Sequence, residues 1–155
     1  MANDKAAEVG NGQRAFWTLL FFMLVGPALG GLATAGLFSI GAVAGLAPEP
    51  FTGKPLAQVA PHIVPIAITG FVWSAIPAAF TGIAIFPMVL KTGTVSFFMA
   101  AAIGVIAFTA AILIFPFPTG GIQPVIAFVA GCIAVAVRQL LLRAGILKQQ
   151  PLAAT

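Results

Sequence analysis

Few side chains in this sequence are of the types that carry out chemistry. Among its 155 residues, His62 is the one histidine, Cys132 is the one cysteine, and no Asp or Glu follows Glu49. A lone histidine cannot supply both axial ligands of a haem, and it lacks the neighbours that a zinc site needs. The absence of paired carboxylates removes the usual groups for general acid–base catalysis. We therefore expect a protein that is not an enzyme and that holds no metal or cofactor.

His62 and Cys132 each have an ordinary structural interpretation. His62 follows Pro61 at the outer end of a predicted span, where we expect an interfacial residue that starts a helix. The alternative is that a homodimer pairs two copies of His62 across its axis. Cys132 lies in an apolar run and is expected to be a small buried residue. The glycines of "FPTGGIQP" lack the lysine spacing of a phosphate loop and predict a tight turn.

The composition indicates an integral membrane protein. Hydrophobic residues make up 61% of the chain and charged residues 6%, whereas soluble domains carry about 25% charged residues. The net charge of +4 comes from scattered basic residues rather than from a basic patch, which argues against a nucleic-acid partner. The partner we expect is the lipid bilayer.

Four apolar stretches are long enough to cross a bilayer. They cover residues 16–46, 63–90, 95–115 and 124–142, and the connections contain the Pro, Gly and Thr typical of turns. The sequence therefore predicts an all-α four-helix bundle that forms a single membrane domain over residues 1–155, with short tails at 1–15 and 143–155.

The basic residues predict the orientation of the chain. An even number of spans places both termini on one side, and that side receives Lys5, Arg14, Lys91, Arg138, Arg143 and Lys148, while the other receives Lys54. By the positive-inside rule both termini are cytoplasmic, and we expect a bacterial inner membrane. A re-entrant first segment would divide the basic residues and is disfavoured. Cleavage of a signal peptide after Ala35 is also disfavoured, because the remaining apolar run would be too short to span.

The stretch "VGPALGGLATAG" at residues 25–36 places small residues four apart in the first span. Gly26 pairs in this spacing with Gly30, Gly31 with Ala35, and Gly41 with Gly45. Small residues let helix backbones approach closely in lipid, where the hydrophobic effect gives little attraction between helices. We therefore expect the first helix to offer seams for close packing.

Prolines occur inside the first two predicted spans. Pro27 cannot donate to the carbonyl of Met23, and Pro77 cannot donate to that of Trp73, so both positions predict kinks. The two neighbourhoods resemble each other loosely, but the abundance of Gly and Ala favours chance over an internal repeat. Transporters use such freed carbonyls as ion sites, although prolines are also simply common in membrane helices.

Three further residues are candidate contacts with a partner or with lipid. Arg138 lies short of the cytoplasmic end of the fourth span, where its side chain is expected to snorkel to the headgroups with Arg143 nearby. The alternative is a buried Arg138 that pairs with another subunit or with a lipid phosphate. Trp73 lies deep in the second span, where packing against a helix is expected and a cofactor or lipid-tail contact is the alternative.

By elimination, the sequence favours a small structural or accessory subunit of a membrane assembly. Such a subunit acts by self-association or by packing against another membrane subunit. The alternative is a protomer of an oligomeric transporter or channel, whose path would gather hydroxyls such as those of Thr34, Thr69 and Thr81. A membrane enzyme or haem protein ranks third, because the single histidine counts against it.

Overall fold

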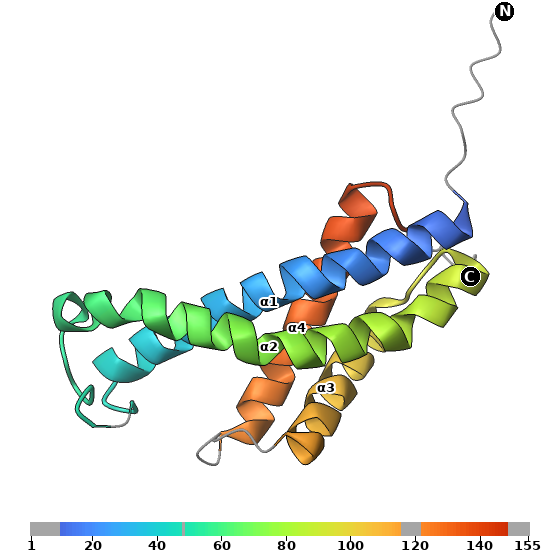
Figure 1. The fold of residues 1–155 in the computed structure, drawn as a ribbon. Helices are drawn as coiled ribbons and strands as arrows, with labels where there is room; N and C mark the ends of the chain where they lie inside the picture. The colour runs from blue at the N-terminus through green and yellow to red at the C-terminus, as the bar shows by residue number, and fades with distance from the viewer. Residues whose placement is uncertain (1–9, 48, 116–121, 149–155) are drawn as a thin grey trace, which may run out of the picture.

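The computed structural model describes residues 10–47, 49–115 and 122–148 (Figure 1). Within these ranges it contains four α-helices and no strand: α1 Asn11–Val43, α2 Leu56–Thr92, α3 Phe97–Ile114 and α4 Gln123–Arg143. Each helix is long and apolar enough to cross a membrane. The prediction of an all-helical chain with four candidate spans is confirmed. The predicted turn around Gly120 and Gly121, and the outer parts of both predicted tails, lie outside the described residues.

Two helices begin earlier than the sequence predicted. α1 begins at Asn11, so the last residues of the predicted tail 1–15 are helical. α2 begins at Leu56 and contains Pro61 and Pro65, so most of the predicted loop before residue 63 is also helical. A proline leaves one carbonyl without its helical partner. For Pro61 that carbonyl belongs to Ala57, which is exposed in the first turn of α2 and can be solvated there.

The connection between α2 and α3 is short, and its residues include the one that ends α2 and the one that caps α3. Gly93 ends α2 in a left-handed conformation with φ of 70°, and its N–H donates to the Val89 carbonyl. Glycine tolerates this conformation because it has no Cβ. The Ser96 hydroxyl then accepts a hydrogen bond from the Met99 N–H at 3.1 Å and caps the start of α3.

The helices form two antiparallel hairpins that lie across each other (Figure 1). α1 and α2 have the most extensive contact, α3 packs on α4, and the hairpins meet mainly through α2 with α3 and α1 with α4. At 1.5 Å per residue, the 37 residues of α2 extend about 55 Å, whereas the 18 residues of α3 extend about 27 Å. The first hairpin therefore reaches well beyond the second.

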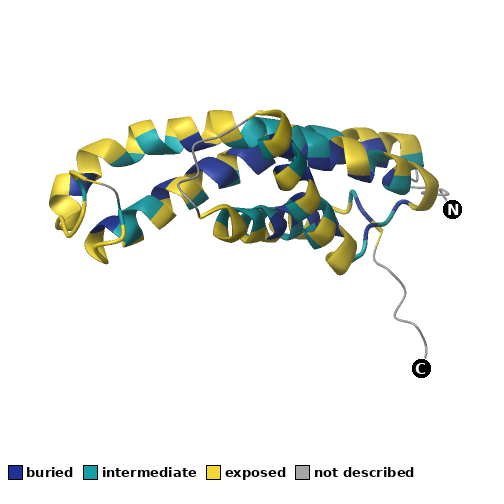
Figure 2. Ribbon diagram, turned by 90° about the horizontal axis from the view of Figure 1, so that it is seen from below, coloured by how far each residue is buried: buried dark blue, intermediate teal, exposed yellow. Residues whose placement is uncertain are grey.

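The pattern of buried residues follows from the difference in length between the two hairpins. Dark buried positions gather where the two hairpins overlap, and the far part of the α1–α2 hairpin is largely exposed (Figure 2). The core joins Ala15 and Phe22 of α1, Ile85 of α2, and Val137 and Leu141 of α4. The outer part instead exposes large apolar side chains, including Leu32, Ile40, Leu46, Val64 and Ile68.

Candidate functional site

Three glycines of α1 lie in close contact with α2. A Cβ atom built on Gly26 would lie 2.9 Å from the Cβ of Ala78, and one on Gly31 would lie 2.5 Å from the carbonyl oxygen of Ala67. A Cβ on Gly30 would overlap the side chain of Ser74. The structure therefore places these three glycines directly against α2, at the spacing that lets membrane helices pack closely.

The predicted pair of Gly41 and Gly45 does not continue this seam. Gly45 lies beyond the end of α1, and a Cβ on Gly41 would meet only Leu46 and Ala47, at ordinary distances of 3.7 Å or more. Spacing alone cannot reveal this, because the helix ends at Val43 and the chain turns back there. The expectation of a packing seam at Gly41 and Gly45 was wrong.

A second glycine seam joins α3 and α4. A Cβ on Gly104 would lie 2.7 Å from that of Ala134, and one on Gly131 would lie 3.0 Å from a methyl of Val105. This seam was not predicted from the sequence. The signal was present in the spacing of Ala100 with Gly104, which is the same pattern of small residues four apart.

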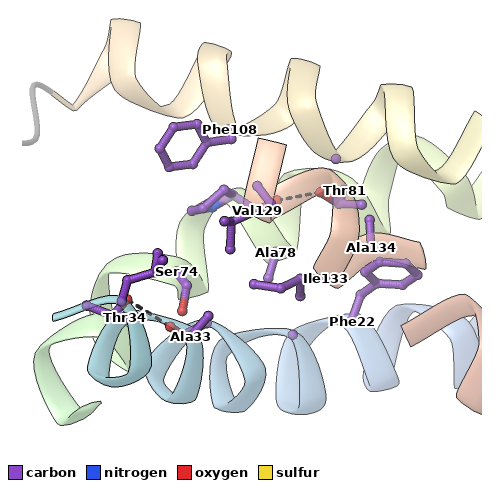
Figure 3. A pocket seen from close by; sticks show the side chains of 16 residues that line it. Phe22, Ala33, Thr34, Ser74, Ala78, Thr81, Phe108, Val129, Ile133 and Ala134 are labelled. Atoms are coloured by element: carbon purple, nitrogen blue, oxygen red, sulfur yellow. Dashed lines mark hydrogen bonds between the residues drawn. The ribbon is translucent and has the colours of Figure 1, made fainter. Parts of the chain in front are cut away.

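A cavity lies between all four helices at the point where the hairpins cross (Figure 3). A sphere the size of a water molecule can reach about 80 Å³ within it, and the cavity is partly open to the outside. Apolar side chains form most of the wall, among them Phe22 of α1, Phe108 of α3 and Ile133 of α4. No charged or titratable side chain lines it among the described residues. The cavity is therefore suited to apolar or weakly polar groups.

Three hydroxyl groups are the polar side chains of this wall: those of Thr34, Ser74 and Thr81 (Figure 3). Each donates to the carbonyl four residues earlier in its own helix, at 2.7 to 2.8 Å, as expected for hydroxyls in apolar helices. Ser74 also lies 3.2 Å from the carbonyl oxygen of Pro27 and so links α2 to α1. Thr69 is exposed and does not line the cavity.

Both prolines singled out in the sequence lie near this cavity. Pro77 is buried and forms part of the wall, and its carbonyl accepts from Thr81. Pro27 is fully buried in α1, and its carbonyl accepts from Ser74. Each proline lies inside a helix that continues on both sides of it. The kinks expected at these positions remain predictions.

The ends of the helices meet at a second region, which we call the basic junction: Asn11, Arg14, Lys91, Gly93, Val95, Arg138, Arg143 and Lys148. Arg14 is buried, and one of its terminal nitrogens donates to the carbonyls of Gly145 and Ile146 at 3.2 and 2.6 Å. The N–H of Lys148 donates to the Gly93 carbonyl at 3.0 Å. These bonds tie the start of α1, the end of α2 and the segment after α4 together.

Arg138 is buried in the basic junction rather than extended to the surface. It is 9% exposed, and its Nε donates to the Val95 carbonyl at 2.6 Å. The expectation of a snorkelling side chain was therefore wrong. The alternative, a buried Arg138 that pairs with another subunit or with a lipid phosphate, stays a prediction, and the Val95 carbonyl is a partner that the sequence did not predict. A sequence shows carboxylates but not which backbone carbonyls are within reach. Arg143, five residues later and on a different face of α4, is exposed.

The remaining candidate residues lie apart from the cavity and from the basic junction. His62 is exposed near the start of α2, with its ring edge-on to Phe51 at 4.9 Å between centroids. Trp73 is 37% exposed on the surface of α2. Cys132 is exposed on α4, so the expectation of a buried cysteine was wrong. A thiol is apolar enough for such a surface.

Comparisons with known proteins add no family to this description. No protein-family model matches the chain, and no curated protein or solved structure matches it. In the described part of the chain, no three His, Cys, Asp or Glu side chains are grouped to hold a metal ion.

Proposed function

We propose that this protein is a structural or accessory subunit of a membrane assembly, which acts by packing its α1–α2 hairpin against a partner helix. The observation that carries this proposal is the outer part of that hairpin, which α3 and α4 leave uncovered (Figures 1 and 2). The glycine seam of α1 already packs on α2. The partner must therefore use the other faces of the hairpin.

One face of the hairpin has the shape that a partner helix needs. A groove runs between α1 and α2, with an empty volume of about 940 Å³ that includes open solvent. Its walls are apolar and come from Leu32 and Ala35 on one side and from Val64, Ile68 and Phe71 on the other. Close contact between such apolar walls and a helix drives association in lipid through van der Waals packing. The partner is a second copy of this chain or another membrane subunit.

The lengths of the helices constrain how this protein lies in the membrane. A bilayer has a hydrocarbon core of ~30 Å, so α1 and α2 must tilt, bend at Pro27 and Pro77, or emerge from it. The first and last described residues lie at the same end of the bundle (Figure 1). Together with the bias of basic residues, this supports cytoplasmic termini in a bacterial inner membrane.

A comparison of two tryptophan variants tests the packing role. Val64→Trp fills the groove, whereas Ile106→Trp adds the same bulk to an exposed position of α3. After purification in mild detergent, Val64→Trp is expected to lose the oligomer or the co-migrating subunit, and Ile106→Trp to keep it. A wild-type protein that migrates as a lone monomer contradicts the proposal.

Labelling of introduced cysteines tests the orientation. Cys132 is first replaced by Ala, and single cysteines are then placed at Asn3, Thr52 or Ala153. In intact cells an impermeant maleimide is expected to label position 52 alone. Labelling of position 3 or 153 without labelling of 52 contradicts the orientation.

A transport protomer is the second candidate, because the cavity wall combines three hydroxyl groups with Pro77, and one of these hydroxyls, that of Ser74, also contacts the Pro27 carbonyl. The space inside the cavity that a water-sized sphere can reach is about 80 Å³, which suits a small ion or water rather than a drug-sized ligand, whose sites measure about 300–1,000 Å³. The test is flux through proteoliposomes that contain the purified protein. Val129→Trp fills the cavity and is expected to abolish any flux, whereas Val125→Trp, on the exposed start of α4, retains it. No flux of ions or small solutes in the wild type excludes this candidate.

A further inference from the structure

The basic junction contains more positive charge than the described chain neutralises. Lys91, Arg138 and Arg143 all belong to it, and the one described carboxylate side chain, that of Glu49, lies in the α1–α2 connection at the other end of α1 and α2. Helix dipoles do not balance this charge. The N-termini of α1 and α3 and the C-termini of α2 and α4 meet here, so their partial charges of about half a unit each cancel.

The three cations differ in how they are held. Arg138 is fixed in a buried position, and its Nε is occupied by Val95. The planar guanidinium still carries two terminal amino groups, the arrangement that binds phosphate oxygens in pairs. Lys91 and Arg143 are exposed in the last turns of α2 and α4. A buried donor with exposed cations on the neighbouring helix ends suits a small anion with several oxygens.

Aromatic side chains place this end of the bundle at the membrane surface. Phe16 and Trp17 lie in the first turns of α1, and Phe97 and Phe98 lie in the first turn of α3. All four are exposed, and Phe98 is 81% exposed. Tryptophan is typical of the headgroup region of membrane proteins, and exposed phenylalanines at the same end of the bundle supply contacts for acyl chains. An anion that binds beside them has its attached chains in hydrocarbon.

We propose that the basic junction binds the phosphodiester headgroup of an anionic phospholipid. Arg138 donates to the phosphate oxygens from its terminal amino groups, and Lys91 and Arg143 supply the remaining positive charge. The exposed aromatic residues hold the acyl chains. This site does not depend on whether the α1–α2 groove holds a partner, because the two lie at different parts of the α1–α2 hairpin.

The test is a titration of purified full-length protein in a neutral detergent with fluorescently labelled phosphatidylglycerol. The wild type is expected to bind this lipid more tightly than labelled phosphatidylcholine. Unlabelled phosphatidylglycerol is expected to compete, and inorganic phosphate is not, because it lacks acyl chains. Equal affinity for the two lipids overturns the proposal. This is the result expected if the carboxylates of Asp4 and Glu8 neutralise the basic junction. If inorganic phosphate competes at the same concentration, the site binds a free anion, and the proposal that the anion belongs to a lipid is overturned.

Charge variants test the position of the site. Each basic residue near a membrane surface contributes about a fivefold change in affinity for anionic lipid. Lys91→Gln and Arg143→Gln are therefore each expected to raise the Kd for phosphatidylglycerol about fivefold, and the double variant about 30-fold. Lys54→Gln removes the same charge from the exposed α1–α2 connection and is the matched control. A Kd that is unchanged in the double variant, or raised equally by Lys54→Gln, overturns the proposal.

Discussion

The Nε atom of Arg138 in α4 lies 2.6 Å from the carbonyl oxygen of Val95 in the connection between α2 and α3. This bond joins the last helix to the middle of the chain at a buried position. A charged donor in an apolar environment costs free energy unless it is hydrogen-bonded. Together with the bonds from Arg14 and Lys148, it makes the basic junction the place where the ends of the helices are fixed to one another.

Loss of this donor is expected to destabilise the protein. Arg138→Met keeps most of the stem but leaves the Val95 carbonyl without its partner, and hydrogen bonds to charged groups contribute about 1.5–3 kcal/mol. The midpoint of thermal unfolding in detergent is expected to fall. Arg138→Lys keeps the positive charge but changes the geometry of the donor. Its unfolding midpoint is expected to lie between those of the wild type and Arg138→Met. Arg143→Met, at an exposed position, is the control. If it lowers the unfolding midpoint as much as Arg138→Met does, the structural role of Arg138 is contradicted.

The glycine seam predicts that two glycines of α1 differ sharply in their tolerance of alanine. Gly30→Ala places a methyl group into the side chain of Ser74, whereas Gly36→Ala meets nothing within 4 Å. Overpacking of this kind costs about 1–3 kcal/mol, while Ala in place of an unhindered helical Gly gains about 0.5–1 kcal/mol. Thermal unfolding should therefore occur earlier in Gly30→Ala and no earlier in Gly36→Ala. Equal midpoints contradict the close contact of α1 with α2.

Gly93 is expected to be sensitive for two separable reasons. Its φ of 70° disfavours any residue with a Cβ, and an added Cβ would lie 2.9 Å from Oδ1 of Asn11. Gly53 has a φ of 66° but nothing within 4 Å. Alanine at either position pays the backbone cost of about 1–2 kcal/mol. Gly93→Ala is expected to lose more stability than Gly53→Ala, and the difference measures the crowding in the basic junction.

How far the sequence predicts this molecule depends on the physical cause of each feature. The four helices follow from apolar runs that are long enough to span a bilayer, and Gly93 is a local signal for the end of α2. The start of α2 was missed because Pro61 and Pro65 resemble loop residues. Their effect depends on whether the freed carbonyls are solvated, which the sequence does not show.

The candidate sites depend on contacts between distant parts of the chain. Gly26, Gly30 and Gly31 were singled out by spacing, but that spacing does not say that α2 covers them. Thr34 and Thr81 were candidate polar groups, and Ser74 joins them only where the hairpins cross. Arg138 was singled out as a candidate contact with a partner or with lipid. Its acceptor, the Val95 carbonyl, has no signature in the sequence.

Two buried threonines give the last prediction. Thr18 in α1 is fully buried, and its Oγ1 has no hydrogen-bond partner among the described residues. Thr81 in α2 is also buried, but its Oγ1 donates to the Pro77 carbonyl at 2.7 Å. Valine has nearly the same shape as threonine and lacks the hydroxyl.

A buried hydroxyl without a partner costs roughly 1–3 kcal/mol, so Thr18→Val is expected to leave stability unchanged or to raise it. Thr81→Val removes a satisfied hydrogen bond, which contributes about 0.5–1.5 kcal/mol, and is expected to lower stability. The measurement is thermal unfolding of both variants in the same detergent. If Thr18→Val loses as much stability as Thr81→Val, the Thr18 hydroxyl has a partner from outside the described chain. The packing of α1 against its neighbours near Arg14 would then include that partner.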